Sequence, residues 1–129
     1  MYSHKDIVAR AWLVKEVVNS ILLAEQLTVD KIFLIGSYAS GKQTEWSDLD
    51  FLIQLRGGKQ IGKLYPDWKQ IREIHAKLDS PRIHVIFGTQ SAAESLYQKN
   101  KNNSKDYSYK ELTLGEIDHA YSYSATITQ

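Results

Sequence analysis

Residues 31–55 read KIFLIGSYASGKQTEWSDLDFLIQL and contain two short apolar runs separated by a polar loop. The first run, residues 31–35, is rich in β-branched and aromatic residues and stops at Gly36, so it predicts a buried strand. Residues 38–42 predict one helical turn. The second run, residues 48–55, predicts another strand. We therefore expect two strands joined by a helical turn and a polar loop.

The chain around this segment supplies further elements. Apolar residues at three- and four-residue steps predict a helix from residue 5 to about residue 27, with Ser3 as its N-cap. A second amphipathic helix is expected over residues 67–78. Residues 82–87 predict a third strand and residues 91–98 a short helix. The apolar stripe of the second helix is expected to contain Trp68, Ile71, His75 and Leu78.

The order helix, strand, strand, helix, strand, helix predicts a small α/β or α+β domain. We place this domain at residues 1–98. Residues 99–129 are read as a polar C-terminal extension that is flexible in part or binds a partner, and residues 113–129 show no clear period.

The chain has 129 residues, the size of one ordinary domain, and 43% of them are hydrophobic. It has no cysteine, which excludes disulfides, a thiolate nucleophile and cysteine-based metal sites. The formal net charge of +1 creates no overall field toward nucleic acid or an anionic membrane. No apolar run reaches the length of a membrane span. We expect a cytoplasmic protein with no membrane partner, while nucleic acid stays open as a partner.

The junction after the first strand has the features of a phosphate site. Gly36 and Ser37 lie where a strand gives way to a helical turn, so free backbone N–H groups favour an anion there. Glycine lets a phosphate approach the backbone closely, and the Ser37 hydroxyl adds a donor. A glycine and a serine after a strand are common, so this feature alone is a weak signal.

Asp48 and Asp50 form the second feature. Their spacing of two residues on a strand places both carboxylates on one face, while Leu49, Phe51 and Ile53 point into the core. Two neighbouring carboxylates suit a hard divalent cation such as Mg²⁺, which also binds substrate phosphates. The alternative is an acidic pair that simply faces solvent.

The two features together are more specific than either one. A phosphate cradle ends one strand and a pair of metal-binding carboxylates opens the next. This arrangement suits transfer from a nucleoside triphosphate, in which the cradle holds phosphates and cations assist attack at the α-phosphorus.

These residues resemble the G-S-x10-D-x-D signature of the DNA polymerase β-like nucleotidyltransferase superfamily. Ten residues separate Ser37 from Asp48, which matches the signature without a gap. Ser47 before the first acid and the apolar residues after the second also fit. The short chain looks most like the minimal nucleotidyltransferases, with a resemblance over roughly residues 5–88.

The resemblance implies a small mixed sheet flanked by helices, with Mg²⁺ bound by Asp48 and Asp50. It also implies transfer of a nucleoside monophosphate, with AMP from ATP as the expected group, to an acceptor hydroxyl. Many minimal members serve as antitoxins of HEPN-domain toxins, and some transfer AMP onto the toxin. The implied partners are ATP or another nucleoside triphosphate, a toxin or other protein acceptor, and a second copy of the chain.

One position departs from the family pattern. Members usually supply a third carboxylate from a later strand, and the matching position here holds His84. The imidazole is either a substitute ligand or general base, with Mn²⁺ then favoured over Mg²⁺, or the mark of a weakened active site. A third reading shifts the strand register and takes the acid from elsewhere, such as Asp79.

The family pattern also bears on the surrounding loop. Ser40 stands where many minimal members carry arginine, so Lys42 is the candidate to supply positive charge to the phosphates, unless it is simply a solvated lysine. Ser47 is the further candidate for nucleotide binding. The rival to an enzyme is a binding module that keeps the fold, neutralises a partner by contact or senses nucleotide.

Overall fold

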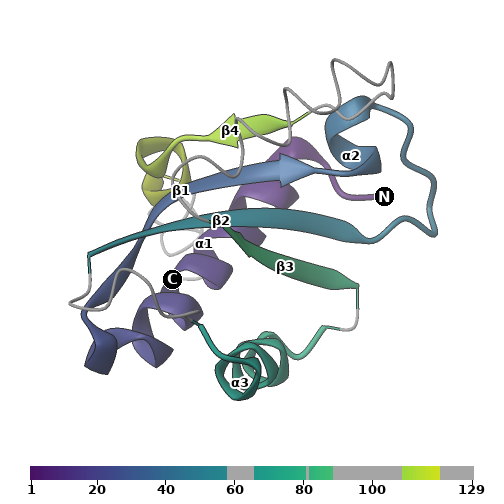
Figure 1. Ribbon diagram of the computed structural model, residues 1–129. Coiled ribbons are helices and arrows are strands. Elements are labelled where there is room, and N and C mark those ends of the chain that lie inside the picture. Colours follow the sequence, from purple (N-terminus) through teal and green to yellow (C-terminus); the bar gives the residue numbers. More distant parts are fainter. Residues whose placement is uncertain (58–65, 81, 89–108, 120–129) are drawn as a thin grey trace, which may run out of the picture.

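The computed structural model describes residues 1–57, 66–80, 82–88 and 109–119. Its centre is a four-stranded sheet in the order β3-β2-β1-β4 (Figure 1). The first strand pairs antiparallel with the second and with the fourth, whereas the second and third run parallel. The strands are β1 (Leu27–Ile35), β2 (Leu49–Gly57), β3 (Ile83–Gly88) and β4 (Lys110–Leu112). The mixed sheet confirms the expected α+β fold class.

Two long helices pack on the same face of this sheet. They are α1 (His4–Ile21) and α3 (Trp68–Leu78), which also contact each other (Figure 1). Ser3 caps α1 as expected: its hydroxyl accepts from the Asp6 N–H, and the Asp6 carboxylate accepts from the Ser3 N–H. A short helix, α2 (Ser37–Ser40), follows β1 with Gly41 as its C-cap, close to the helical turn predicted over residues 38–42.

The first helix is shorter than expected, and the first strand is longer. Residues 22–27 still carry a helix-like apolar pattern, but the chain turns there through a short 3-10 helix, η1 (Leu23–Glu25). Gln26 then adopts a left-handed conformation, with φ 59°, that ends the helical run. The chain therefore enters β1 at Leu27 rather than at residue 31.

Side-chain alternation gives the sheet two different faces. The face toward the helices carries the main core, which includes Ile32, Leu34, Leu49, Phe51, Ile53, Ile83 and Val85. The opposite face carries a smaller cluster of Phe33 and Leu52, with Ile35 and Tyr109 packed against it. Because residues alternate along a strand, Asp50 and His84 lie on this opposite face, away from the helices.

The second long helix buries the expected face except at its first residue: Leu78 is buried, and Ile71 and His75 are half-buried. Asp67 caps it, and Gln70 completes a capping box. Ile74 and Leu78 are its buried residues, whereas Trp68 is 61% exposed, so the expectation that Trp68 belongs to the buried stripe is wrong. Trp68 is the first residue after the cap, where the helix presents its ring to solvent beneath the Arg72 guanidinium.

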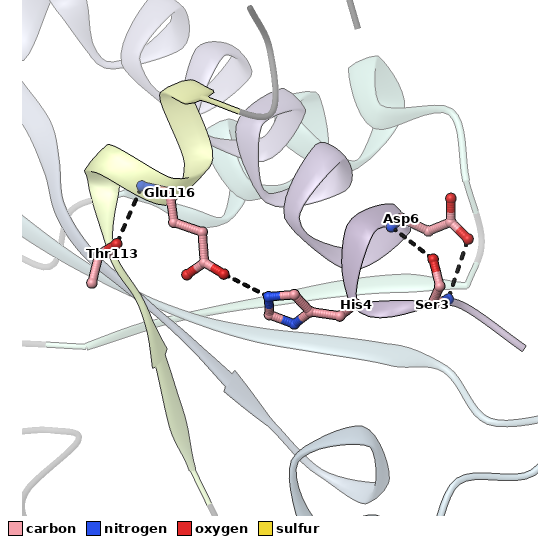
Figure 2. A network of polar contacts seen from close by, with 5 residues as sticks. All are labelled: Ser3, His4, Asp6, Thr113 and Glu116. Carbon is pink, nitrogen blue, oxygen red and sulfur yellow. Dashed lines mark hydrogen bonds and ion pairs between the residues drawn. The ribbon is translucent and has the colours of Figure 1, made fainter. Parts of the chain in front are cut away.

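Part of the stretch read as a polar extension belongs to the sheet and core. Residues 110–112 form β4, and Ile117, in the helical residues 114–119, is completely buried. The Thr113 hydroxyl accepts from the Glu116 N–H, and the Glu116 carboxylate contacts His4 of α1 (Figure 2). A short amphipathic turn inside a polar stretch leaves no periodic signal, so only the packing locates it. The domain boundary at residue 98 stays a prediction.

Two further expectations concern a short helix and a membrane span. The predicted helix over residues 91–98 lies outside the described residues. Within the described ranges, the structure has no helix whose length and hydropathy would suit a membrane crossing.

The contributions of the two sheet faces to stability can be compared by truncating one isoleucine on each face. Ile53 on β2 is fully buried toward the helices, whereas Ile86 on β3 is 52% exposed on the other face. We expect Ile53→Ala to lower the free energy of unfolding by about 2–5 kcal/mol. Ile86→Ala is expected to change it by less than about 0.5 kcal/mol. Urea denaturation measures both, and equal losses would contradict this assignment of the core.

Candidate functional site

The acid pair lies at one end of the central strands. Asp50 is on β2, and its backbone neighbours are Ile35, the last residue of β1, and His84 on β3. Asp48 comes directly before β2, where the Leu49 N–H donates to the Arg82 carbonyl. The Asp50 side chain is 29% exposed and that of Asp48 is 42% exposed. Both carboxylates can therefore meet a ligand from solvent.

His84 lies beside both carboxylates. Its Nδ1 is 3.3 Å from Asp50 Oδ1, and its Nε2 is 3.8 Å from Asp48 Oδ2. The strand register pairs His84 directly with Asp50, and its equivalence to the third acid of the family stays a prediction. Asp79 instead ends α3, where it adopts a left-handed conformation. The reading that shifts the register toward Asp79 is not supported by this pairing.

The electrostatics of the pair are uneven. Burial raises the pKa of the Asp50 carboxyl above its ordinary value, the nearby His84 opposes this rise, and the negative charge of Asp48 adds to it. The carboxylate form of Asp50 is thus destabilised by its surroundings. A bound cation would offset this destabilisation, because its positive charge would attract both carboxylates.

Gly36 lies against Asp50 from the other side. Its φ of 74° and ψ of −155° belong to a region that is essentially restricted to glycine. A Cβ atom at this position would lie 2.5 Å from Asp50 Oδ2, closer than atoms can approach. Gly36 is required here for both reasons, and the turn that opens α2 is brought into contact with the acid pair.

The remaining predicted nucleotide-binding residues lie in and after this turn. Ser37 is the first residue of α2, and the first N–H groups of a helical turn have no acceptor inside it. Lys42 follows the turn, donates its backbone N–H to the Ser37 carbonyl and has an exposed side chain. The Ser47 hydroxyl accepts from the Thr44 N–H at 2.8 Å, so it shapes the loop before Asp48. Their binding roles stay predictions.

Two features beside the acid pair were not found in the sequence. One is a hollow of about 380 Å³ next to His84, lined also by His75, Ala76, Asp79, Ser80 and Ile83. The other is the indole of Trp46, which meets the Arg82 guanidinium although the two residues are far apart in sequence. Neither has a sequence signal, because the hollow depends on how the end of α3 meets β3. The ring contact depends on how the loop before β2 meets the residue before β3.

The donor set suits a cation that is shared with a substrate. Among the described residues, no three or more histidine, cysteine, aspartate or glutamate side chains are arranged to hold a metal ion. Asp48 and Asp50 would supply carboxylate oxygens to one side of a cation only. Mg²⁺ is commonly bound in this way, through one or two carboxylates with substrate phosphates and water as its other ligands. The two aspartates therefore fit Mg²⁺ or Mn²⁺ in the presence of a nucleotide.

The contact between Gly36 and Asp50 can be tested by substitution. Gly36→Ala should lower the free energy of unfolding by about 1–3 kcal/mol through its backbone conformation, with an additional loss from the clash. Adding Asp50→Ala removes the clashing oxygen, so the cost of Gly36→Ala should fall in that background without disappearing. Chemical denaturation of the four proteins in this cycle gives both components.

Gly115→Ala is the matched control for that cycle, because a Cβ at Gly115 would meet nothing within 4 Å. It should leave stability unchanged or raise it slightly. A cost of Gly36→Ala that is the same with and without the Asp50 carboxylate would contradict the contact.

The raised pKa of Asp50 predicts a pH-dependent effect on stability. Its charged form is disfavoured in the folded state, so the penalty is present above the raised pKa and disappears as the pH falls through it. Asp50→Asn should therefore raise the melting temperature of the metal-free protein at neutral pH, and the gain should shrink in acid. Thermal unfolding in the presence of a chelator, between about pH 4 and about pH 8, measures this gain. The interval runs from the pH at which carboxyl groups ordinarily titrate to above neutrality.

The control for this measurement is Glu73→Gln, which removes one negative charge from an exposed position of α3. It should show no comparable gain. If Asp50→Asn instead lowers the melting temperature at neutral pH, the stabilising contact of the Asp50 carboxylate with His84 outweighs the cost of burying that carboxylate.

Comparison with known proteins gives a family for this arrangement. Residues 14–110 match the family model described as a nucleotidyltransferase domain. No curated protein matches the sequence significantly.

Two solved structures resemble the chain. One, described as a toxin-antitoxin with AMP-PNP, is 20% identical, with 89% of this chain and 86% of that chain covered and a TM-score of 0.42. The other, a candidate nucleotidyltransferase from Sulfolobus solfataricus, is 16% identical, with 84% and 87% covered and a TM-score of 0.40. Scores this low carry no argument about function, so the assignment depends on the family model alone.

The matched residues include most of the chain and contain the glycine turn, both aspartates and His84. They also contain β1, β2, α3 and β3, the elements that position those side chains. The chain therefore belongs to the nucleotidyltransferase domain family.

Proposed function

We propose that this protein transfers a nucleoside monophosphate from a nucleoside triphosphate, with ATP as the expected donor, to an acceptor hydroxyl. One observation carries the proposal: a Cβ atom at position 36 would lie 2.5 Å from Asp50 Oδ2, so the glycine turn lies directly against the acid pair. A triphosphate held by the turn after β1 would therefore have its phosphates beside both carboxylates.

In this reaction the acceptor oxygen forms a bond to the α-phosphorus, and the bond from that phosphorus to the oxygen bridging the β-phosphate breaks. Pyrophosphate leaves, and the hydroxyl proton passes to a base. Gly36 and Ser37 bind and orient the phosphates in this proposal, with Lys42 and Ser47 as further candidates. A divalent cation at Asp48 and Asp50 would neutralise phosphate charge and make the acceptor hydroxyl easier to deprotonate.

His84 decides how well the site works. Its ring nitrogens lie 3.3 Å and 3.8 Å from the two carboxylates, so the imidazole is the candidate to take the acceptor proton or, after a change in side-chain position, to serve as a further ligand. The same contacts also favour the second candidate function. A protonated His84 would neutralise part of the acid pair without any metal, which suits a binding module that has lost turnover.

The acceptor is expected to come from outside this chain. The resemblance to minimal nucleotidyltransferases makes a protein partner, such as a HEPN-type toxin, the leading acceptor, with a second copy of the chain as the alternative. The hollow beside His84 is open to solvent and is our candidate place for the acceptor.

The experiment follows transfer of label from α-labelled ATP to total protein or RNA of the native host, with Mg²⁺ or Mn²⁺. We expect labelled product from the wild type and none from Asp48→Asn or Asp50→Asn. His84→Asp should improve transfer with Mg²⁺ if the site is weakened. His84→Ala should abolish transfer if the imidazole itself is the ligand or base.

Binding is measured in parallel from the melting temperature. Mg²⁺ with ATP at about 100 times the dissociation constant should stabilise the wild type by roughly 2.7 kcal/mol. Asp48→Asn with Asp50→Asn should lose this effect, and Glu73→Gln should keep it. Nucleotide binding without labelled product in any variant would favour the binding module. Absence of both binding and product would reject the proposed function.

A further inference from the structure

The loop that leads to the acid pair is held in one shape by its own hydrogen bonds. The Thr44 N–H donates to the Ser47 hydroxyl at 2.8 Å, and the Ser47 N–H donates to the Thr44 carbonyl at 3.1 Å. The Trp46 N–H donates to the Thr44 hydroxyl at 3.2 Å. Side-chain bonds of this kind stabilise a turn where no helix or strand does so. The loop therefore presents Trp46 in a defined position.

This position exposes a large aromatic ring. Trp46 is 75% exposed, although tryptophan is highly buried on average. The Arg82 guanidinium lies 5.6 Å from the centre of its ring, within the range of a cation–π contact. Arg82 also donates to the Glu45 carbonyl at 3.1 Å, so the loop backbone anchors the guanidinium beside the indole.

The pair lies beside the carboxylates, on the side away from the glycine turn. The Arg82 carbonyl accepts from the N–H of Leu49, the residue between Asp48 and Asp50. His84, which contacts both carboxylates, follows Arg82 by two residues and is separated from it by about 7 Å along the strand. In sheet order, the turn after β1 comes first, Asp50 on β2 second, and Arg82, directly before β3, third. Trp46 belongs to the loop before β2 and is placed on this side by its contact with the Arg82 guanidinium.

We propose that Trp46 and Arg82 form a stacking platform for a planar aromatic ring that is joined, before or after transfer, to the α-phosphorus. The inference rests on the proposed function, because it takes the glycine turn as the place of the β- and γ-phosphates. The group attached to the α-phosphorus on the side opposite the β-phosphate then lies toward Trp46 and Arg82. Two groups meet that description: the nucleobase of the donor, and an aromatic ring that carries the acceptor hydroxyl.

Fluorescence of Trp46 tests the platform directly. The chain has three tryptophans, so Trp12→Phe with Trp68→Phe leaves Trp46 as the single tryptophan, which is excited selectively at a wavelength that tyrosine does not absorb. We titrate this variant, in Mg²⁺, with ATP, with inorganic tripolyphosphate and with N-acetyltyrosinamide. A change in emission with ATP but not with tripolyphosphate identifies the nucleobase as the stacked ring. A change with the tyrosine amide alone identifies the ring of the acceptor.

Affinity gives a second, independent readout. Stacking of a base on an aromatic side chain contributes about 5- to 150-fold in affinity. Trp46→Ala should therefore weaken binding of the stacked probe by that factor and leave tripolyphosphate binding unchanged, while Trp46→Phe should restore most of it. The matched control is Trp68→Ala, because Trp68 is also exposed and carries its own guanidinium, Arg72, at 4.5 Å. It should change neither affinity.

The half-buried Trp12 packs against the core, so its replacement can destabilise the protein. The wild-type chain labelled with 5-fluorotryptophan removes this difficulty, because ¹⁹F NMR follows the Trp46 resonance, assigned with Trp46→Phe. Normal ATP binding with no response of Trp46 to either aromatic probe, and no loss in Trp46→Ala, would overturn the platform alone. Absence of binding of both ATP and tripolyphosphate to the wild type would overturn the platform together with the proposed function.

Discussion

The contact between the Gly36 backbone and the Asp50 carboxylate is the constraint around which the site is built. It needs a backbone conformation that only glycine adopts easily, and it needs a residue without a Cβ. Because Asp50 sits on the central strand β2, the same contact fixes the turn after β1 relative to His84 on β3. Three strands thus contribute to one small polar site at one end of the sheet.

The sheet separates stability from chemistry. Its helix-facing side holds the main core, whereas the acid pair and His84 lie on the other side, where a charged group is reached by solvent. Substitutions at the acid pair therefore change charge without leaving a cavity in the main core. This separation allows one fold to keep its packing whether His84 supports turnover or marks its loss, and it explains why the fold alone does not decide between enzyme and binding module.

Much of the fold and the candidate site could be predicted from local sequence. Two apolar runs and the spacing between Ser37 and Asp48 are local patterns, and they indicated the strands, the turn and the face of the acid pair. The helix cap at Ser3 was predicted, and the second long helix was predicted to start at Asp67, which is its cap. Both are local features, because capping depends on a few adjacent residues. The position opposite Asp50 followed from alternation along residues 82–87, and the strand register agrees with it.

The rest depended on contacts between segments distant in sequence. The chain leaves α1 early because Gln26 turns it into β1, although residues 22–27 continue a helical pattern. Ile117 is buried only because residues 114–119 reach the core beside α1. The meeting of Trp46 with Arg82 likewise joins a loop to the start of a strand. The sequence by itself determined that two carboxylates share one face of a strand, because their spacing is a local pattern. Only the tertiary structure decided which residues surround them, because packing joins segments that are distant in sequence.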